Sequence, residues 1–333
     1  MTHKQHPIGS GFTAASSATD VLAGIDLTGR QIIVTAGHVG LGLETTRALS
    51  RAGASVVVGA RSPERAAAAV ADLPGVQVHR LDLLDPRSVA DFAAGYLDTG
   101  RPLHTLVNNA GIMGGPLVRD GRGYEAQFAT NHLGHFQLTN ALLPALRAAT
   151  GARVVELSSW GHHLSDIRWD EPHFEDESSY DGMLAYGQSK TANVLFAVEL
   201  DRLWSDDGIR GYALHPGGIL GTNLAPWMPD EGWKLMGLID EHGNVVIDPD
   251  RDLKTPQQGA ATTVWAATSP LLDDIGGVFL QNSDIAPLED IDEPVAVEFG
   301  TGPFEMTVGV TRYAVDPESA QRLWGLSEKL LAV

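Results

Sequence analysis

Tyr186 and Lys190 are the residues whose types and spacing point most directly to chemistry. They are four residues apart in a segment expected to be helical, so the phenol and the ammonium would lie on one face of that helix. A tyrosine hydroxyl, with a reference pKa of about 10, is a poor base at neutral pH until positive charge stabilises its phenolate. Tyr-x-x-x-Lys alone is common, but here Ser158-Ser159 precedes it and His215-Pro216-Gly217-Gly218 follows it. This order of motifs predicts a proton-transfer site.

A glycine-rich turn indicates a second part of the site. The run Thr35-Ala36-Gly37-His38-Val39-Gly40-Leu41-Gly42 follows an apolar strand signal and opens a helical pattern. Glycines there let the backbone approach a pyrophosphate at a helix N-terminus. The alternative is a tight strand-to-helix connection that binds no ligand. Ala36 must adopt an allowed φ, because it lacks the freedom of glycine.

Elements that would position these motifs alternate along the chain. Short apolar runs predict strands at residues 31–35, 55–60, 76–81, 103–108, 153–158 and 209–215. Helical patterns occupy residues 63–73, 86–97, about 124–149 and about 185–204. Because the runs are apolar throughout, they predict a parallel sheet with helices on both faces. The expected fold is α/β, a Rossmann-like doubly wound parallel sheet in a single domain, with the ligand crevice at the carboxyl ends of the strands.

The domain organisation predicted is a flexible N-terminal tail at residues 1–25 and one dinucleotide-binding domain at residues 26–333. Two long segments, 160–183 and 217–254, interrupt the alternation. Long connections without regular structure usually bind or cover something, so the second segment is predicted to be a substrate lid. Its apolar residues could equally pack on the domain; they are Trp227, Met228, Trp233, Leu235 and Met236.

Composition excludes several classes of site and partner. A formal charge of −19 makes nucleic acid and anionic membranes unfavourable partners. The absence of cysteine excludes disulfides, thiolate metal sites and thiol nucleophiles. His132 and His135 lie three residues apart with no nearby acidic ligand, which favours packed histidines over a metal site, so no metal is expected. Without a signal-peptide core or a span of about 20 apolar residues, a cytoplasmic protein is predicted.

Taken together, these motifs resemble those of the short-chain dehydrogenase/reductase family. The fingerprint Thr-Gly-x-x-x-Gly-x-Gly is matched at Thr35, Gly40 and Gly42, with Ala36 replacing the first glycine. Asn108-Asn109-Ala110-Gly111 matches a second family element. The resemblance implies that Tyr186 is the general acid/base, Ser159 orients the substrate oxygen, Lys190 activates the tyrosine and binds the ribose, and Asn131 belongs to the proton relay.

The resemblance also implies a nicotinamide cofactor. Arg61 follows the second strand, where an arginine accommodates a 2′-phosphate, so NADP(H) is expected and NAD(H) is disfavoured. An ordinary surface arginine is the alternative, and Arg65 lies near. Asp82 matches the adenine-binding aspartate, although it could instead cap a helix. The full set of expected cofactor contacts is Thr35, Gly37, Gly40, Leu41, Gly42, Arg61, Ser62, Asp82, Leu83, Asn109, Ala110, Gly111, Tyr186, Lys190, Pro216, Gly217, Ile219 and Thr222.

Within the family, the chain resembles the retinol dehydrogenase-like and protochlorophyllide reductase-like branch. Ser159 lies 27 residues before Tyr186, a long and polar separation, and the ending Arg322-Leu323-Trp324 looks similar too. A bacterial NADP(H)-dependent alcohol dehydrogenase or carbonyl reductase for an apolar small molecule is expected, as a homodimer or homotetramer. Alternatives are a C=C double-bond reductase, disfavoured because that branch relies on a cysteine, and a non-catalytic NADP(H)-binding sensor.

Overall fold

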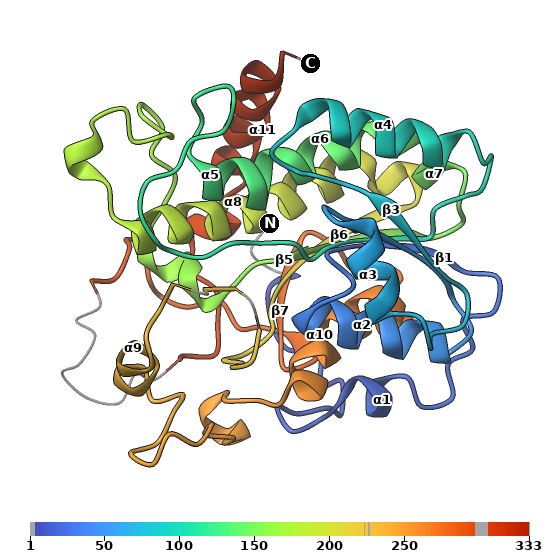
Figure 1. Cartoon of the computed structure of the whole chain (residues 1–333), viewed down its shortest axis with the longest axis horizontal. Helices are drawn as coiled ribbons and strands as arrows, with labels where there is room; N and C mark the ends of the chain where they lie inside the picture. The colour runs from blue at the N-terminus through green and yellow to red at the C-terminus, as the bar shows by residue number, and fades with distance from the viewer. Residues whose placement is uncertain (1–3, 223, 226, 297–305, 333) are drawn as a thin grey trace.

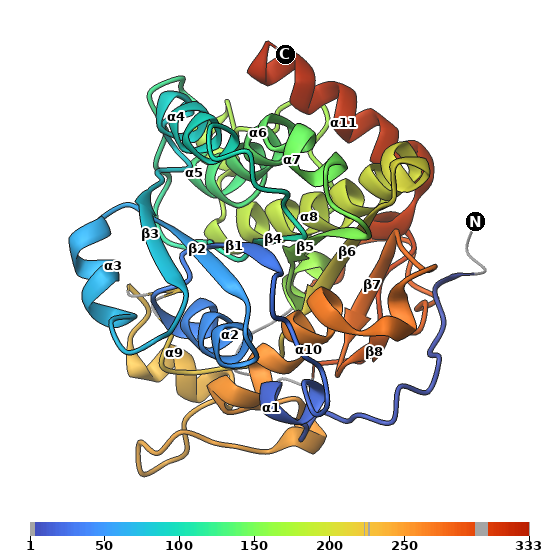
Figure 2. The ribbon, with the colours of Figure 1, turned by 90° about the vertical axis from the view of Figure 1, so that its right-hand side faces the viewer.

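An eight-stranded sheet runs through the molecule (Figure 1), and its strands follow the order β3-β2-β1-β4-β5-β6-β7-β8 (Figure 2). We describe residues 4–222, 224–225, 227–296 and 306–332 of a computed structural model. Strands β1 to β7 are parallel and β8 runs antiparallel to β7. The strands are β1 (Gln31–Thr35), β2 (Ser55–Ala60), β3 (Val76–Arg80), β4 (Thr105–Asn108), β5 (Ala152–Leu157), β6 (Ile209–His215), β7 (Val278–Gln281) and β8 (Asp284–Ile285).

Helices cover both faces of this sheet (Figures 1 and 2). One face carries α1 (Ala18–Val21), α2 (Gly40–Arg51), α3 (Pro63–Ala69) and α10 (Pro256–Thr268). The other carries α4 (Pro86–Leu97), α6 (Gly134–Ala141), α7 (Leu143–Arg147), α8 (Gly182–Trp204) and α11 (Pro317–Leu331). Successive strand residues point to opposite faces, so Val34 packs with α2 and α10 while Ile33 packs with α4 and α6. This arrangement confirms the predicted doubly wound α/β fold.

Two strands were not predicted. Strand β7 is a four-residue apolar run behind Gly276-Gly277, and β8 has only two residues, so neither gives a sequence signal of normal strand length. The predicted helix at residues 124–149 is instead α5 (Ala126–Phe128), a π-helical turn at Ala129–Leu133, α6 and α7. The break between α6 and α7 falls at Leu142, just before Pro144 in the first turn of α7, because proline lacks the N–H that a continuous helix needs.

The N-terminal segment differs from the flexible tail that was predicted. Buried Gln5 donates to the carbonyl oxygens of Phe279 and Ala286 at 2.8 and 2.6 Å and accepts from the Phe279 amide. Further along, α1 packs on α10, and Val21 is buried in the same cluster as Trp265. The described part of this segment therefore packs against β7 and α10, at the side of the sheet that ends in β8.

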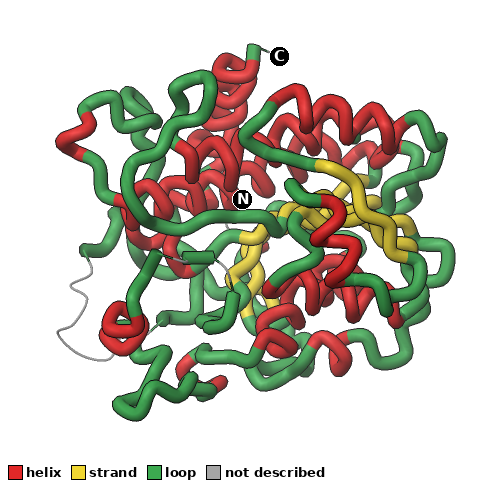
Figure 3. The backbone as a smooth tube through the Cα atoms, in the orientation of Figure 1, coloured by secondary structure: helices red, strands yellow, loops and turns green. Residues whose placement is uncertain are grey.

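The connection from β6 to α10 is built mostly from loops and turns (Figure 3). It contains the short helix α9 (Asp230–Leu235) and a 3₁₀ turn at Pro249–Arg251. The other long connection, from β5 to α8, begins with a 3₁₀ helix at Trp160–Leu164. Within the described residues, no helix is long and apolar enough to cross a membrane.

Candidate active site

One pocket at the carboxyl ends of the strands collects most of the predicted residues. Those that line it are Gly40, Leu41, Gly42, Asn109, Ala110, Gly111, Ser159, Tyr186, Lys190, Pro216, Gly217, Ile219 and Thr222. Among the described residues, its lining leaves out Thr35, Gly37, Arg61, Ser62, Asp82, Leu83 and Asn131. The pocket thus extends from the glycine-rich turn to the tyrosine and lysine of α8.

The glycine-rich turn allows a ligand to approach the backbone closely. Ala36 has a φ of +52°, so the alanine adopts the left-handed conformation that glycine favours. A Cβ atom on Gly42 would lie 2.5 Å from both the Ala36 carbonyl oxygen and Asn109 Nδ2. Asn109 in turn donates to the Thr35 carbonyl oxygen at 2.8 Å. Helix α2 begins at Gly40, so unpaired amide groups face this cradle, and the residues fit a dinucleotide pyrophosphate.

Positive charge gathers beside this turn, at the end of β2. Arg61 follows β2 directly, and Ser62 is the N-cap residue of α3. Burial lowers the pKa of His38, and the charges of Arg65 and Arg61 lower it further. Next to them, after β3, Asp82 accepts from the Leu84 amide at 3.2 Å. Asp82 does not cap α4, since Asp85 is the N-cap residue of that helix.

Tyr186 and Ser159 meet where β5 ends and α8 begins. Asp181 caps α8 by accepting from the amides of Met183 and Leu184, which fixes the start of the helix just before Tyr186. Ser159 follows β5 and accepts from the Gly161 amide at 3.0 Å. A Cβ atom on Gly161 would lie 2.7 Å from Tyr186 Cε1, so only glycine lets the ring approach this turn.

Burial controls the protonation of the pair on α8. It raises the pKa of Tyr186 to about 12, and a hydrogen bond with Ser159 acts in the opposite direction. Burial lowers the pKa of Lys190 to about 8, against the charge of Glu156. Lys190 Nζ lies 5.5 Å from the Tyr186 ring centroid and donates to the Leu157 carbonyl oxygen at 2.7 Å. At neutral pH the tyrosine is therefore a proton donor beside a cation.

Asn131 sits behind the pocket, in the π-helical turn. Its side chain accepts from the Ile112 amide at 2.9 Å and donates to the Ile112 carbonyl oxygen at 3.0 Å and to Ser189 Oγ at 2.9 Å. It therefore ties the loop after β4 to α8. The nearby His132 and His135 are fully buried. His132 contacts Ser327 and His135 contacts Thr35, so both are packed histidines.

Glu156 is a buried acid that sequence reasoning missed. It is fully buried on β5 and accepts hydrogen bonds from Asn108 and Asn193. Burial raises its pKa to about 8, although those bonds and the charge of Lys190 act in the opposite direction. The one available signal is a single acid inside the otherwise apolar run of residues 154–157.

The remainder of the pocket is apolar. Its wall includes Met113, Leu164, Met183, Leu224, Trp233, Met236, Leu238 and Met306. Two of these, Trp233 and Met236, were predicted as lid residues, whereas Leu235 is half exposed. Trp227 instead lies over Gly114 and Gly115 and donates to the Met113 carbonyl oxygen at 2.7 Å. Met113, Met183 and Met306 were not predicted, because they lie outside any motif.

Comparisons with known proteins agree with this geometry. The family model described as short chain dehydrogenase matches residues 30–169. A protein named "Probable oxidoreductase" from Streptomyces lividans is 44% identical over 307 residues, covering 90% of this chain and 97% of that protein. Retinol dehydrogenase 11 from Mus musculus is 33% identical over 79% of this chain and 80% of its own. A crystal structure of an uncharacterized protein from Mycobacterium Paratuberculosis is 32% identical, with a TM-score of 0.70 over 96% of this chain and 98% of that one.

Proposed function

Because the chain belongs to the short-chain dehydrogenase/reductase family, we propose that it is an NADP(H)-dependent carbonyl reductase or alcohol dehydrogenase for an apolar small molecule. The observation that carries the proposal is the single pocket that joins the glycine-rich turn to Ser159, Tyr186 and Lys190. A dinucleotide on the turn would bring its reactive end to these side chains.

The chain's residues account for the proton half of the reaction. Bound NADPH would supply the hydride to the carbonyl carbon. Tyr186 is protonated at neutral pH and would give its proton to the carbonyl oxygen, while the Ser159 hydroxyl orients that oxygen. Lys190 lies close enough for its charge to stabilise the resulting phenolate. Alcohol oxidation is the reverse sequence, with the phenolate as base.

Cofactor choice rests on the cations near the turn. A 2′-phosphate is paired well by a guanidinium, and the charges of Arg61 and Arg65 lie close enough to the turn to lower the pKa of His38 in an otherwise acidic chain. We expect NADPH to bind at least 10-fold more tightly than NADH. Replacing Arg61 with alanine should remove most of that preference, measured by fluorescence titration with each cofactor. Equal affinities in the wild-type protein would contradict NADP(H) dependence.

Substrate class follows from the wall of the pocket. Trp233 and four of the six methionines, Met113, Met183, Met236 and Met306, face the space beside Tyr186. Such flexible, polarizable side chains adapt to apolar ligands of varied shape. We therefore expect aromatic and long-chain aldehydes or ketones to be better substrates than small polar ones.

A homodimer or homotetramer stays a prediction, which light scattering on the purified protein tests.

Tyr186→Phe tests the mechanism. The variant should bind NADPH within a few-fold of wild type, but its turnover should fall by about 10²–10⁴, the usual contribution of a positioned acid or base. Tyr124→Phe is the matched control, because that hydroxyl donates to the Leu330 carbonyl oxygen outside the pocket. Turnover of Tyr186→Phe close to wild type, in an NADPH consumption assay with a carbonyl panel, would refute the proposal.

A further inference from the structure

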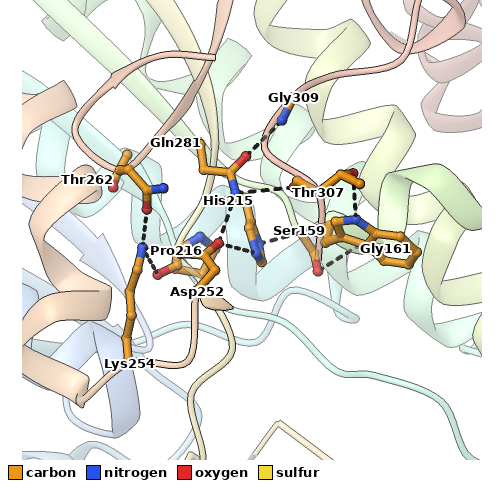
Figure 4. A network of polar contacts seen from close by, with 12 residues as sticks. Ser159, Gly161, His215, Pro216, Asp252, Lys254, Thr262, Gln281, Thr307 and Gly309 are labelled. Atoms are coloured by element: carbon orange, nitrogen blue, oxygen red, sulfur yellow. Dashed lines mark hydrogen bonds and ion pairs between the residues drawn. The ribbon is translucent and has the colours of Figure 1, made fainter. Parts of the chain in front are cut away.

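A buried cluster of polar side chains lies beside the pocket, centred on Asp252 (Figure 4). Asp252 is 3% exposed and sits where the long connection after β6 returns to α10. Its φ is +61°, a conformation that non-glycine residues rarely adopt and that aspartate and asparagine tolerate best. The mechanism above does not use this residue.

Asp252 contacts three segments that meet at the pocket. Its Oδ1 lies 2.7 Å from Lys254 Nζ and its Oδ2 lies 3.3 Å from His215 Nε2, at the end of β6. Gln281, at the end of β7, donates to Oδ2 at 2.8 Å. The Asp252 carbonyl oxygen accepts from the Gly218 amide at 2.8 Å, which holds the start of the connection against its end.

Lys254 neutralises the carboxylate. It is fully buried, and Nζ also donates to Asn282 Oδ1 at 2.5 Å and to the Pro216 carbonyl oxygen at 3.4 Å. Burial alone would raise the pKa of Asp252, but His215 and Lys254 outweigh it and hold that pKa below its usual range. The carboxylate is therefore ionised, and its charge is balanced within the cluster.

The hydrogen bonds of His215 determine its tautomer. The Trp160 amide donates to His215 Nδ1 at 3.0 Å, so Nδ1 carries no proton. The proton of the neutral ring must then be on Nε2, which faces Asp252 Oδ2. Trp160 directly follows Ser159, so the histidine holds the backbone next to the serine hydroxyl.

From these contacts we propose that Asp252 is a positioning residue: its carboxylate accepts a hydrogen bond from the Nε2–H of His215, which fixes the Trp160 amide and with it the place of Ser159. The same side chain fastens the connection of residues 217–254 to the ends of β6 and β7. The role of Ser159 rests on the proposed function, whereas the tautomer of His215 does not depend on it.

Two double variants separate the hydrogen-bonding role of Asp252 from the effects of its charge and of its backbone conformation. Asp252→Asn with Lys254→Met removes both charges but keeps an oxygen for His215 and Gln281. Asp252→Gly with Lys254→Met removes that oxygen, and glycine fits a φ of +61° without strain. Asp273→Asn is the control for general loss of a partly buried ion pair, since Asp273 pairs with Arg153 away from the pocket.

Nitrogen NMR of histidine-labelled protein gives the readout independent of activity, with His215→Gln to assign the signal. We expect wild type and the asparagine variant to show the Nε2-protonated form, and the glycine variant to show a mixture of tautomers. With 4-nitrobenzaldehyde as probe, kcat of the glycine variant should fall 10- to 100-fold and the isotope effect from 4-deuterated NADPH should rise, because the reacting groups are misplaced. The asparagine variant and Asp273→Asn should keep kcat within about 3-fold of wild type.

An unchanged His215 signal together with unchanged kcat in the glycine variant would overturn the proposal. If that variant fails to fold, His215→Leu tests the same link from its other end, and full kcat in folded His215→Leu would also overturn it. Wild-type protein that reduces no member of the carbonyl panel refutes the proposed function instead, and the nitrogen signals then decide the role of Asp252.

Discussion

Replacing Glu156 with glutamine should make the stability of this protein less dependent on pH. Burial raises the pKa of Glu156 from its ordinary value of 4.5 to about 8, so the folded state binds this proton more tightly than the unfolded state. The stability due to that proton is full below pH 4.5 and is lost as pH rises towards 8. The difference between the two pKa values corresponds to about 5 kcal/mol at most, of which about 3 kcal/mol falls between pH 5 and pH 8.

The assay is urea unfolding of wild type and Glu156→Gln at pH 5 and pH 8. Packing and hydrogen-bond changes affect both pH values alike, so the informative quantity is the change in the difference between the two proteins. From pH 5 to pH 8 that difference should move by about 3 kcal/mol in favour of the glutamine variant. Glu241→Gln, on the exposed part of the connection before α10, is the control and should show no such change.

A functional consequence accompanies the effect on stability. The charge of Glu156 raises the pKa of Lys190 against the effect of burial, so Glu156→Gln should lower the pKa of Lys190 further. The basic limb of the pH–rate profile should then move to lower pH. A stability difference that is equal at both pH values would show that Glu156 does not change its protonation between them in the folded protein, and would refute the reasoning.

Two glycine-turn predictions concern the cofactor cradle. Gly42→Ala should weaken NADPH binding by at least 10-fold in a fluorescence titration, because the added Cβ would lie 2.5 Å from the Ala36 carbonyl oxygen and Asn109 Nδ2; Gly95→Ala on α4, with nothing within 4 Å, should bind normally. Ala36→Gly should raise the free energy of unfolding by about 0.5 kcal/mol, since relief of the positive φ exceeds the entropy that glycine adds to the unfolded chain. Normal binding by Gly42→Ala, or a less stable Ala36→Gly, would contradict the geometry of this turn.

The sequence predicted the part of the fold that local patterns determine. The bounds of β1, β2, β6 and α4 match the prediction, because fully apolar runs and an Asp-Pro helix start are strong local signals. Strand β7 and the edge strand β8 were missed because they are too short to show a pattern. The order of the N-terminal segment was missed because the partners of Gln5 lie more than 270 residues away.

The same distinction applies to the site. Ser159, Tyr186 and Lys190 could be predicted together because each belongs to a motif with fixed spacing. The partners of buried charges could not, because no local pattern links Asp252 to His215, which is 37 residues earlier. The pocket-lining methionines likewise gain their role only from the fold.

Two buried acids stand on either side of the proton-transfer residues, and their environments differ. Asp252 has a buried ammonium 2.7 Å away and stays ionised, so it can serve as a fixed acceptor that holds His215. Glu156 has amide donors and a more distant lysine, so its proton is retained near neutral pH. A fixed charge suits a residue that only positions others, whereas a group that titrates near pH 8 responds to the charge of Lys190. Loss of Asp252 should therefore affect kcat at every pH, and loss of Glu156 should chiefly change its pH dependence.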